Sequence, residues 1–268
     1  HTKMSQLEGI SSAKEYLTRE RLIKLGAVAD DSVLDNYKDN VKAIIIGHCH
    51  LDHSGAAPYL APRYRCPIYG SPFTIEVLKN TLNDDHIKIP NELRAINPGS
   101  WFNLTKDISI EFINITHSTI QTVVVAISTK YGIVVYANDF KLDNHPVVGK
   151  KPDYPRLKAL GDSKKVLALI SDALYASEEK KTPSEKVARE MLSDVLLGTD
   201  NKGHAILVTT FASHIARLKS IIDLGQELDR KVVFMGRSLK KYVNSAENLK
   251  LVYFKNKIKL LPYRNQIK

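Results

Sequence analysis

Residues 44–53, Ile-Ile-Ile-Gly-His-Cys-His-Leu-Asp-His, constrain this chain most, because an apolar strand ends there in four metal-ligand side chains. His48 and His50 directly follow the apolar residues, and side chains at i and i+2 of an extended chain point the same way. Asp52 and His53 come next. Imidazole and carboxylate groups without a thiolate are donors for zinc and related divalent ions. A cluster of polar surface residues is the alternative, and the strand-to-loop position disfavours it.

Three more donors, His117, Asp139 and Asp172, each come at the end of a predicted strand. We expect neighbouring strands to deliver these side chains to the sheet edge at which the first run ends. The last two donors of the first run are crowded away from the first two, so two adjacent metal ions fit better than one.

Apolar runs bounded by turn residues predict strands at residues 41–46, 108–115, 123–128, 133–136, 166–170, 205–208 and 232–235. Helical spacing predicts helices at residues 56–60, 74–82, 183–197, with Thr182 or Ser184 as N-cap, and 213–228. A hairpin turn at 129–132 indicates antiparallel strands with outer helices in the first part. Strand and helix alternate in the second part, which favours a parallel, doubly wound sheet. We place the boundary near residue 175.

Composition indicates a globular chain, since 43% of its 268 residues are hydrophobic and 25% are charged. No apolar run approaches the roughly 18 residues of a membrane span, and the first residues do not resemble a signal peptide, so we expect a cytoplasmic protein without membrane contact. Cys49 and Cys66 are too few for a disulfide framework.

The net charge of +10 lies mostly in the second part of the chain. Residues 1–172 carry 21 basic and 19 acidic side chains, or +2, whereas residues 173–268 carry 18 and 10, or +8. Basic and aromatic residues alternate from residue 238 onward. This pattern suits a polyanion binder, and it suits an amphipathic surface helix equally well.

The run His48–His53 matches the HxHxDH signature of the metallo-β-lactamase superfamily, and His117, Asp139 and Asp172 follow in the order of its later motifs. Over nearly the whole chain, segments such as Thr-Thr-Phe-Ala-Ser-His-Ile-Ala-Arg and Met-Gly-Arg-Ser-Leu resemble the β-CASP nucleases, and among them the ribonuclease J family, especially its archaeal members. The resemblance implies an α/β fold: an incomplete metallo-β-lactamase αββα sandwich over residues 1–175 and an incomplete, doubly wound β-CASP domain over residues 176–268.

The resemblance also implies a site for two zinc ions, with manganese as the alternative metal. Its ligands would be His48, His50 and His117 at one ion, Asp52 and His53 at the other, and Asp139 bridging both. Asp52 and Asp172 are the expected catalytic residues, and Asp172 matches an acidic motif to which proton transfer to the leaving group is ascribed. Weaker candidates for RNA contacts are Ser118, His214, Arg217, Arg237 and Ser238, for which helix capping is an equal alternative.

The predicted function is that of a zinc-dependent ribonuclease that degrades RNA from the 5′ end, with endonuclease activity as a further expectation. We expect a 5′-monophosphorylated RNA substrate and a homodimer of the full-length protein. The alternatives are a DNA nuclease, a hydrolase of small esters or thioesters, and a non-catalytic RNA-binding subunit. Inactive members lose several ligands, and the six expected ligands named above are all present, which argues against the last.

Two regions of the family have no counterpart in this sequence: a strand-rich segment before the HxHxDH motif and a segment after Gly-Arg-Ser that supplies a last histidine ligand. About forty mostly helical residues precede the motif, and none of the nine histidines lies beyond His214. We therefore expect the chain to be a piece of a larger enzyme. On its own, we expect a weak second metal site and poor activity.

Overall fold

The computed structural model describes residues 18–261. Two segments lie outside this range. They are residues 1–17, for which the sequence predicts no signal peptide, and residues 262–268, at the end of the basic stretch. Its helices are α2 (Arg19–Lys24), α3 (Leu51–Ser54), α4 (Ala57–Leu60), α5 (Pro72–Asp84), α6 (Tyr154–Asp162), α7 (Glu185–Gly198), α8 (Ile215–Glu227) and α9 (Arg237–Asn248), with 3₁₀ helices η2 (Ser32–Asn40) and η3 (Ala61–Arg63). Its strands are β1 (Ile44–Ile46), β2 (Ile68–Gly70), β3 (Leu93–Ala95), β4 (Ser100–Asn103), β5 (Ile108–Asn114), β6 (Val123–Thr129), β7 (Gly132–Asn138), β8 (Val166–Ser171), β9 (Val232–Met235) and β10 (Ile258–Leu261).

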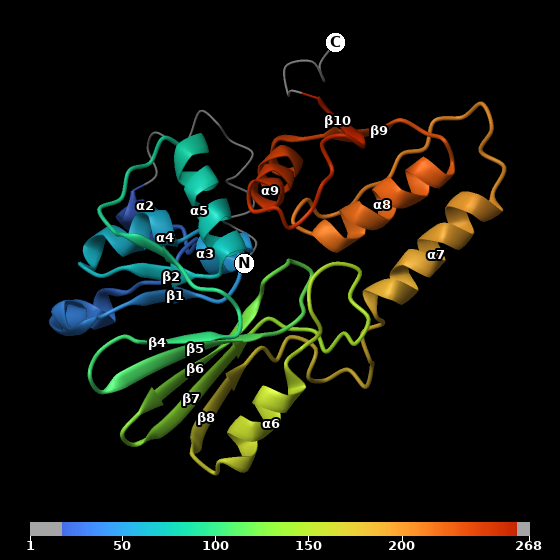
Figure 1. Ribbon diagram of the computed structural model, residues 1–268. Helices are drawn as coiled ribbons and strands as arrows, with labels where there is room; N and C mark the ends of the chain where they lie inside the picture. Colours follow the sequence, from blue (N-terminus) through green and yellow to red (C-terminus); the bar gives the residue numbers. More distant parts are fainter. Residues whose placement is uncertain (1–17, 262–268) are drawn as a thin grey trace.

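The elements up to β8 form four layers, helices and two sheets in the order αββα (Figure 1). Strands β1, β2 and β3 form one sheet, and Ile68 packs on its helical side with Leu78 of α5. On the other side, Tyr69 packs with Phe112 of the five-stranded sheet β4-β5-β6-β7-β8. Leu160 of α6 covers the outer face of that second sheet. The predicted sandwich is therefore confirmed.

The second sheet contains the antiparallel strands that the sequence predicts. Strands β5, β6 and β7 are antiparallel neighbours, with Phe112 opposite Val125, and β6 and β7 are joined at the predicted hairpin turn. Strand β8 then pairs with β7 in parallel. Strand β1 is shorter than predicted, because β2 pairs only with Ile44–Ile46.

The second part of the chain begins with α7 and ends, among the described residues, with β10. Ser184 caps α7, its Oγ accepting a hydrogen bond from the backbone N–H of Lys186 at 3.2 Å, as one of the two predicted caps requires. Helix α8 and strand β9 lie where they were predicted, and β9 pairs in parallel with β10. The parallel order of the predicted doubly wound domain is thus present in partial form, while the boundary at residue 175 stays a prediction.

The strand prediction at residues 205–208 is wrong for the structure as described. A strand needs a hydrogen-bonded neighbour, and none of the described strands pairs with this segment, in which Leu207 is 92% exposed. The basic C-terminal stretch divides into two elements. Its start forms the amphipathic helix α9, which buries Tyr242 and Val243, and its end forms β10, which the sequence did not predict as a strand.

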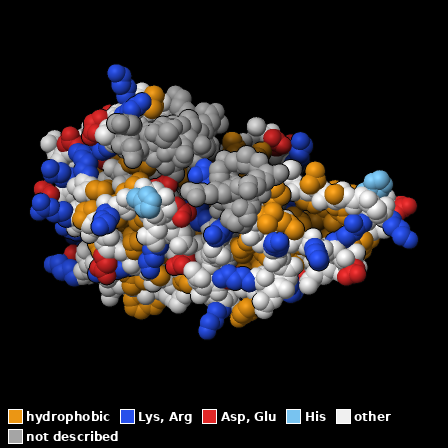
Figure 2. Space-filling model, turned by 90° about the horizontal axis from the view of Figure 1, so that it is seen from above, with side chains coloured by type: hydrophobic (Ala, Val, Ile, Leu, Met, Phe, Trp, Pro, Cys, Tyr) orange, Lys and Arg blue, Asp and Glu red, His pale blue; other side chains and the backbone are white. Residues whose placement is uncertain are grey.

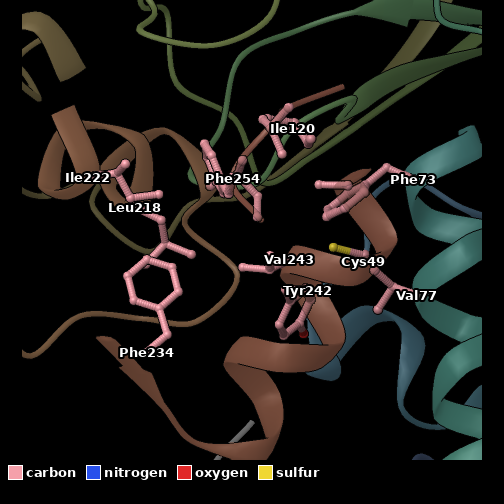
Figure 3. Close-up of a cluster of buried hydrophobic side chains, with 13 residues drawn as sticks. Cys49, Phe73, Val77, Ile120, Leu218, Ile222, Phe234, Tyr242, Val243 and Phe254 are labelled. Atoms are coloured by element: carbon pink, nitrogen blue, oxygen red, sulfur yellow. The ribbon is translucent and has the colours of Figure 1, made fainter. Parts of the chain in front are cut away.

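One hydrophobic cluster joins the two parts of the chain. Phe73 and Val77 of α5 pack in the same cluster as Leu218 of α8 and Val243 of α9, and Figure 3 shows these side chains with Cys49 from the histidine run among them. Helices α8 and α9 therefore share a hydrophobic cluster with Cys49, in the turn that carries His48 and His50.

The surface of the described residues gives no sign of a single basic patch on the face seen in Figure 2, where Lys and Arg side chains are spread out with acidic side chains among them. No helix within residues 18–261 is long and apolar enough to cross a membrane.

Candidate metal centre

The ends of three strands bring the six predicted ligands together. His48 and His50 lie in the turn after β1, Asp52 and His53 in the first turn of α3, His117 after β5 and Asp139 after β7. Their donor atoms form two groups, each within 4.8 Å, that share one member: His48, His50, His117 and Asp139 in the first group, and Asp52, His53 and Asp139 in the second.

Three ring nitrogens of the first group face one point. Nε2 of His48 lies 3.0 Å from Nδ1 of His50, and Nε2 of His117 lies 3.1 Å from the same Nδ1. Oδ2 of Asp139 lies 3.9 Å from Nε2 of His48 and 3.8 Å from Nε2 of His117. The group therefore offers three nitrogens and one oxygen.

Residues outside the ligand set determine which ring nitrogens carry protons. Asn138 donates a hydrogen bond from Nδ2 to the backbone oxygen of Val123 at 2.7 Å, and this directs its Oδ1 to Nδ1 of His48, also at 2.7 Å. Ser213 places its Oγ 3.0 Å from Nε2 of His50. We therefore assign the protons to Nδ1 of His48 and Nε2 of His50. The two nitrogens that face each other then carry lone pairs.

Burial favours the neutral, ligand form of these histidines. It is the main cause that lowers the pKa of His48 to about 2 and the pKa values of His50 and His117 to about 4, with the neighbouring histidines adding to it. Neutral rings at neutral pH leave lone pairs in repulsive contact unless a cation lies among them. Ligands about 2.0–2.1 Å from a tetrahedral zinc ion would be roughly 3.3 Å apart. The ring nitrogens lie 3.0 and 3.1 Å apart, and the Asp139 oxygen is somewhat farther, at 3.8 and 3.9 Å. The first group fits a zinc-type ion.

The second group places two carboxylates around one imidazole. Nε2 of His53 lies 3.2 Å from Oδ2 of Asp52 and 3.4 Å from Oδ1 of Asp139. The hydrogen bond from His53 is the main cause that lowers the pKa of Asp52 to about 2. Burial would lower the pKa of His53, but the two carboxylates outweigh it and raise it. Asp139 turns Oδ2 to the first group and Oδ1 to the second, so the two groups share its carboxylate.

A pocket of about 490 Å³ adjoins this centre. Its walls include the predicted ligands His50, His117 and Asp139 and residues of α7 and α8. Asp172 lines it as an exposed residue just after β8, its Oδ1 accepting a hydrogen bond from the backbone N–H of Leu174 at 3.0 Å.

Of the weaker candidates for RNA contacts, three line this pocket: Ser118, His214 and Arg217. Oγ of Ser118 lies 3.4 Å from Nε2 of His50. Arg237 and Ser238 lie instead in the first turn of α9, apart from the residues that line the pocket. The structure thus brings the metal ligands together with only part of the predicted contact set.

Sequence reasoning missed four residues that organise the site. They are Asn138 and Ser213, which contact ligand histidines, and Asp143 and Glu185, which are 4% exposed and line the pocket. Asn138 stands next to a ligand, which is a usable signal. Ser213 lies in the segment Thr-Thr-Phe-Ala-Ser-His-Ile-Ala-Arg, which the family resemblance singles out. Asp143 and Glu185 act across long sequence separations, and their local patterns give no such signal.

Comparisons with known proteins agree with this architecture. Residues 38–165 match the model of the metallo-beta-lactamase superfamily, and residues 203–265 match that of the ribonuclease J beta-CASP domain. Ribonuclease J of Methanocaldococcus jannaschii is 44% identical over 240 residues, covering 89% of this chain and 53% of that protein. Ribonuclease J of Pyrococcus abyssi is 42% identical over 243 residues, covering 90% and 53%.

The chain therefore spans about half the length of these two curated relatives. Among solved structures, a protein of unknown function from Enterococcus faecalis V583 aligns with a TM-score of 0.55 and 18% identity, covering 84% of this chain and 56% of that one. At this identity the likeness supports the fold alone.

Proposed function

Because this chain belongs to the metallo-β-lactamase superfamily and carries a segment of the ribonuclease J β-CASP domain, we propose that it acts in a metal-dependent ribonuclease. The observation that carries the proposal is the set of six ligands, arranged around the shared carboxylate of Asp139 and opening into a pocket. The similarity to proteins named ribonuclease J supports RNA as the substrate.

We propose two zinc ions as cofactors, with manganese as the alternative. The first group would bind its ion more tightly, because it offers four donors and the second group offers three. Bound in such a pair of sites, divalent ions lower the pKa of a coordinated water and neutralise charge on phosphoryl oxygens.

The protein's own residues would order this chemistry. Asn138 and Ser213 hold the rings of His48 and His50 in the orientation that presents the facing nitrogens. The Asp139 carboxylate fixes the spacing of the two groups. Asp172, exposed at the pocket wall, is our candidate for delivering a proton from its carboxyl group to the leaving oxygen.

For the complete protein we propose attack from the 5′ end of 5′-monophosphorylated RNA, with endonuclease activity as well. A homodimer and a cytoplasmic location belong to the same proposal. They are supported by the family resemblance, and each has its own test, by end-labelled substrates, light scattering and cell fractionation.

The activity is tested by incubating the purified full-length protein, with zinc or manganese, with 5′-monophosphorylated RNA, 5′-triphosphorylated RNA and DNA of the same sequence. We expect mononucleotides from the monophosphorylated RNA and their loss in an Asp52→Ala variant. Failure of the metal-loaded protein to cleave RNA would refute the proposal, and so would an undiminished rate in the variant. Faster cleavage of DNA would establish the DNA nuclease alternative instead.

A further inference from the structure

Glu185 is a carboxylate in an unusual place. It is the first residue of α7, a position at which acidic side chains are favoured by the helix dipole but normally face solvent. Here its side chain is only 5% exposed and lines the pocket beside the metal ligands. A buried carboxylate needs charged or hydrogen-bonding partners, because losing its hydration is costly.

Two residues at the start of α8 provide these partners. Nε and Nη2 of Arg217 donate hydrogen bonds to Oε1 and Oε2 of Glu185 at 2.6 and 3.2 Å, which is a bidentate pair. Nε2 of His214 lies 3.3 Å from the same Oε2. Burial alone would raise the pKa of Glu185, but these two partners outweigh it and lower the pKa to about 2. The carboxylate is therefore ionised at neutral pH.

The same end of α7 is tied to the loops that carry the metal ligands. The buried Asp143 accepts hydrogen bonds from the backbone N–H of Glu185 and from Oγ of Ser184, both at 2.7 Å. Its own backbone N–H donates to Oγ1 of Thr116 at 3.0 Å, one residue before His117. Buried polar contacts thus run from a ligand segment, through Asp143 and Glu185, to α8.

This anchoring leaves donors of Arg217 available. The guanidinium has five N–H groups, and Nε and Nη2 each use one for Glu185. Nη1 has no hydrogen-bond partner among residues 18–261, and the side chain is 33% exposed on the pocket wall. Nδ1 of His214 is likewise buried without a hydrogen-bond partner in the described structure. Glu185 thus holds Arg217 and His214 in place, while Nη1 of Arg217 and Nδ1 of His214 have no hydrogen-bond partner in the described structure.

A purely structural ion pair is the simpler account of Glu185. Replacement of a buried ion pair by apolar residues is often neutral or stabilising, however, so stability alone is a weak reason for one at this point. A fork held by a carboxylate at the wall of a cavity that also contains the metal ligands is suited to binding a phosphate.

We propose that Glu185 is a positioning residue: it holds Arg217 so that the guanidinium binds a phosphate of the RNA beside the metal centre. This inference rests on the proposed function. Asp143 fixes the position of Glu185 relative to the segment of His117, because it hydrogen-bonds both Glu185 and Thr116. Arg217 is the contact residue, and Glu185 acts through it.

The test measures binding of a short fluorescein-labelled single-stranded RNA by anisotropy over a range of salt concentrations, with metal removed by chelation so that no RNA is cleaved. We expect Arg217→Ala to weaken binding at least about tenfold, as for a lost bond to a charged group. It should also reduce the slope of log affinity against log salt by about 0.7, the value for one phosphate contact on a single strand. Arg217→Lys should recover the slope but only part of the affinity, because lysine has no fork.

The decisive variant is Glu185→Gln. Simple electrostatics and the positioning role of Glu185 predict opposite changes in its RNA affinity. Removal of a negative charge beside a polyanion should tighten binding by simple electrostatics, whereas loss of the anchor of Arg217 should weaken it severalfold. The matched control is Glu190→Gln, a similar loss of one charge on the exposed side of α7, which should leave binding unchanged or slightly tighter. Arg189→Ala is the control for arginine, since it is also paired with carboxylates and 29% exposed but lies outside the pocket lining.

Glu185→Asp keeps the charge and shortens the anchor, so it should also weaken binding, and thermal unfolding of each variant checks that it is folded. In an Arg217→Ala background, Glu185→Gln should cause no further loss. Equal or tighter binding by folded Glu185→Gln and Glu185→Asp would overturn the inference, as would additive effects in the double variant. If the unmodified full-length protein does not bind RNA at all, the proposed function fails, and the inference fails with it.

Discussion

Replacement of Gly47 by alanine probes the support of the metal centre without touching a ligand. Gly47 is buried one residue before His48, and its backbone does not need the left-handed region. A Cβ atom there would lie 2.6 Å from Nδ2, 2.8 Å from Cγ and 2.9 Å from Oδ1 of Asn138. The amide side chain that orients His48 therefore has to move.

The size of the effect follows from these distances. Ordinary contact begins at 3.4 Å, so the Asn138 amide must move by about 3.4 − 2.6 = 0.8 Å. This movement would disturb its hydrogen bonds to Val123 and His48, each 2.7 Å long, and a bond lengthened by the full 0.8 Å would reach about 3.5 Å and be largely lost. Each buried group left unpaired costs about 1–3 kcal/mol, so loss of one or both bonds should destabilise the fold by roughly 1–6 kcal/mol. Loss of a partner that orients a ligand typically weakens metal binding about 10–100-fold.

Zinc affinity would be measured by competition with a chromophoric chelator, and stability by urea unfolding of the metal-free protein. Gly161→Ala is the matched control, because Gly161 lies exposed in α6 with no atom within 4 Å of a new Cβ. It should gain up to about 1 kcal/mol of helix stability and keep its zinc affinity. Unchanged zinc binding in Gly47→Ala would refute the argument that Asn138 orients His48.

Three further predictions follow from burial and charge. The lowered pKa of Glu185 means that its ionised form stabilises the fold above about pH 4.5 and that this contribution, roughly 3 kcal/mol, is lost as the pH falls towards 2. The difference in unfolding free energy between wild type and Glu185→Gln should therefore shrink between about pH 6 and pH 3, and a constant difference would contradict the assignment. Burial raises the pKa of Cys49 to about 12 and also raises that of Cys66, so a thiol reagent at neutral pH should modify either residue only after unfolding; rapid labelling of the native protein would show otherwise. Phe73→Ala empties a fully buried position between α5 and the second part of the chain. Urea unfolding should show that the free energy of unfolding falls by about 3–5 kcal/mol. A much smaller fall would be inconsistent with one shared core.

Residues 44–53 show how much of the site can be predicted from neighbouring residues in the sequence. An apolar strand that ends in His48 and His50, followed by Asp52 and His53, already specifies donor types and a common direction, because neighbours in sequence share one turn of chain. The antiparallel strands and the helices α5, α7 and α8 were predictable for the same reason, since periodicity and caps are local signals. The segment at 205–208 failed because its apolar pattern needs a pairing strand, which the described structure does not provide.

The sequence by itself determined the ligand types and the strands β1, β5 and β7 that end at them, since each depends on residues close together along the chain. The αββα sandwich was implied by the family resemblance, and strands β2 and β3 of its first sheet were not predicted. Only the tertiary structure decided which ring nitrogens face one another, that Asp139 turns one oxygen to each group, and that Asn138 and Ser213 orient the histidines. It also placed the buried Glu185 against Arg217, 32 residues away, beside the metal ligands. Such contacts depend on the register and packing of elements distant in sequence, which no local pattern encodes.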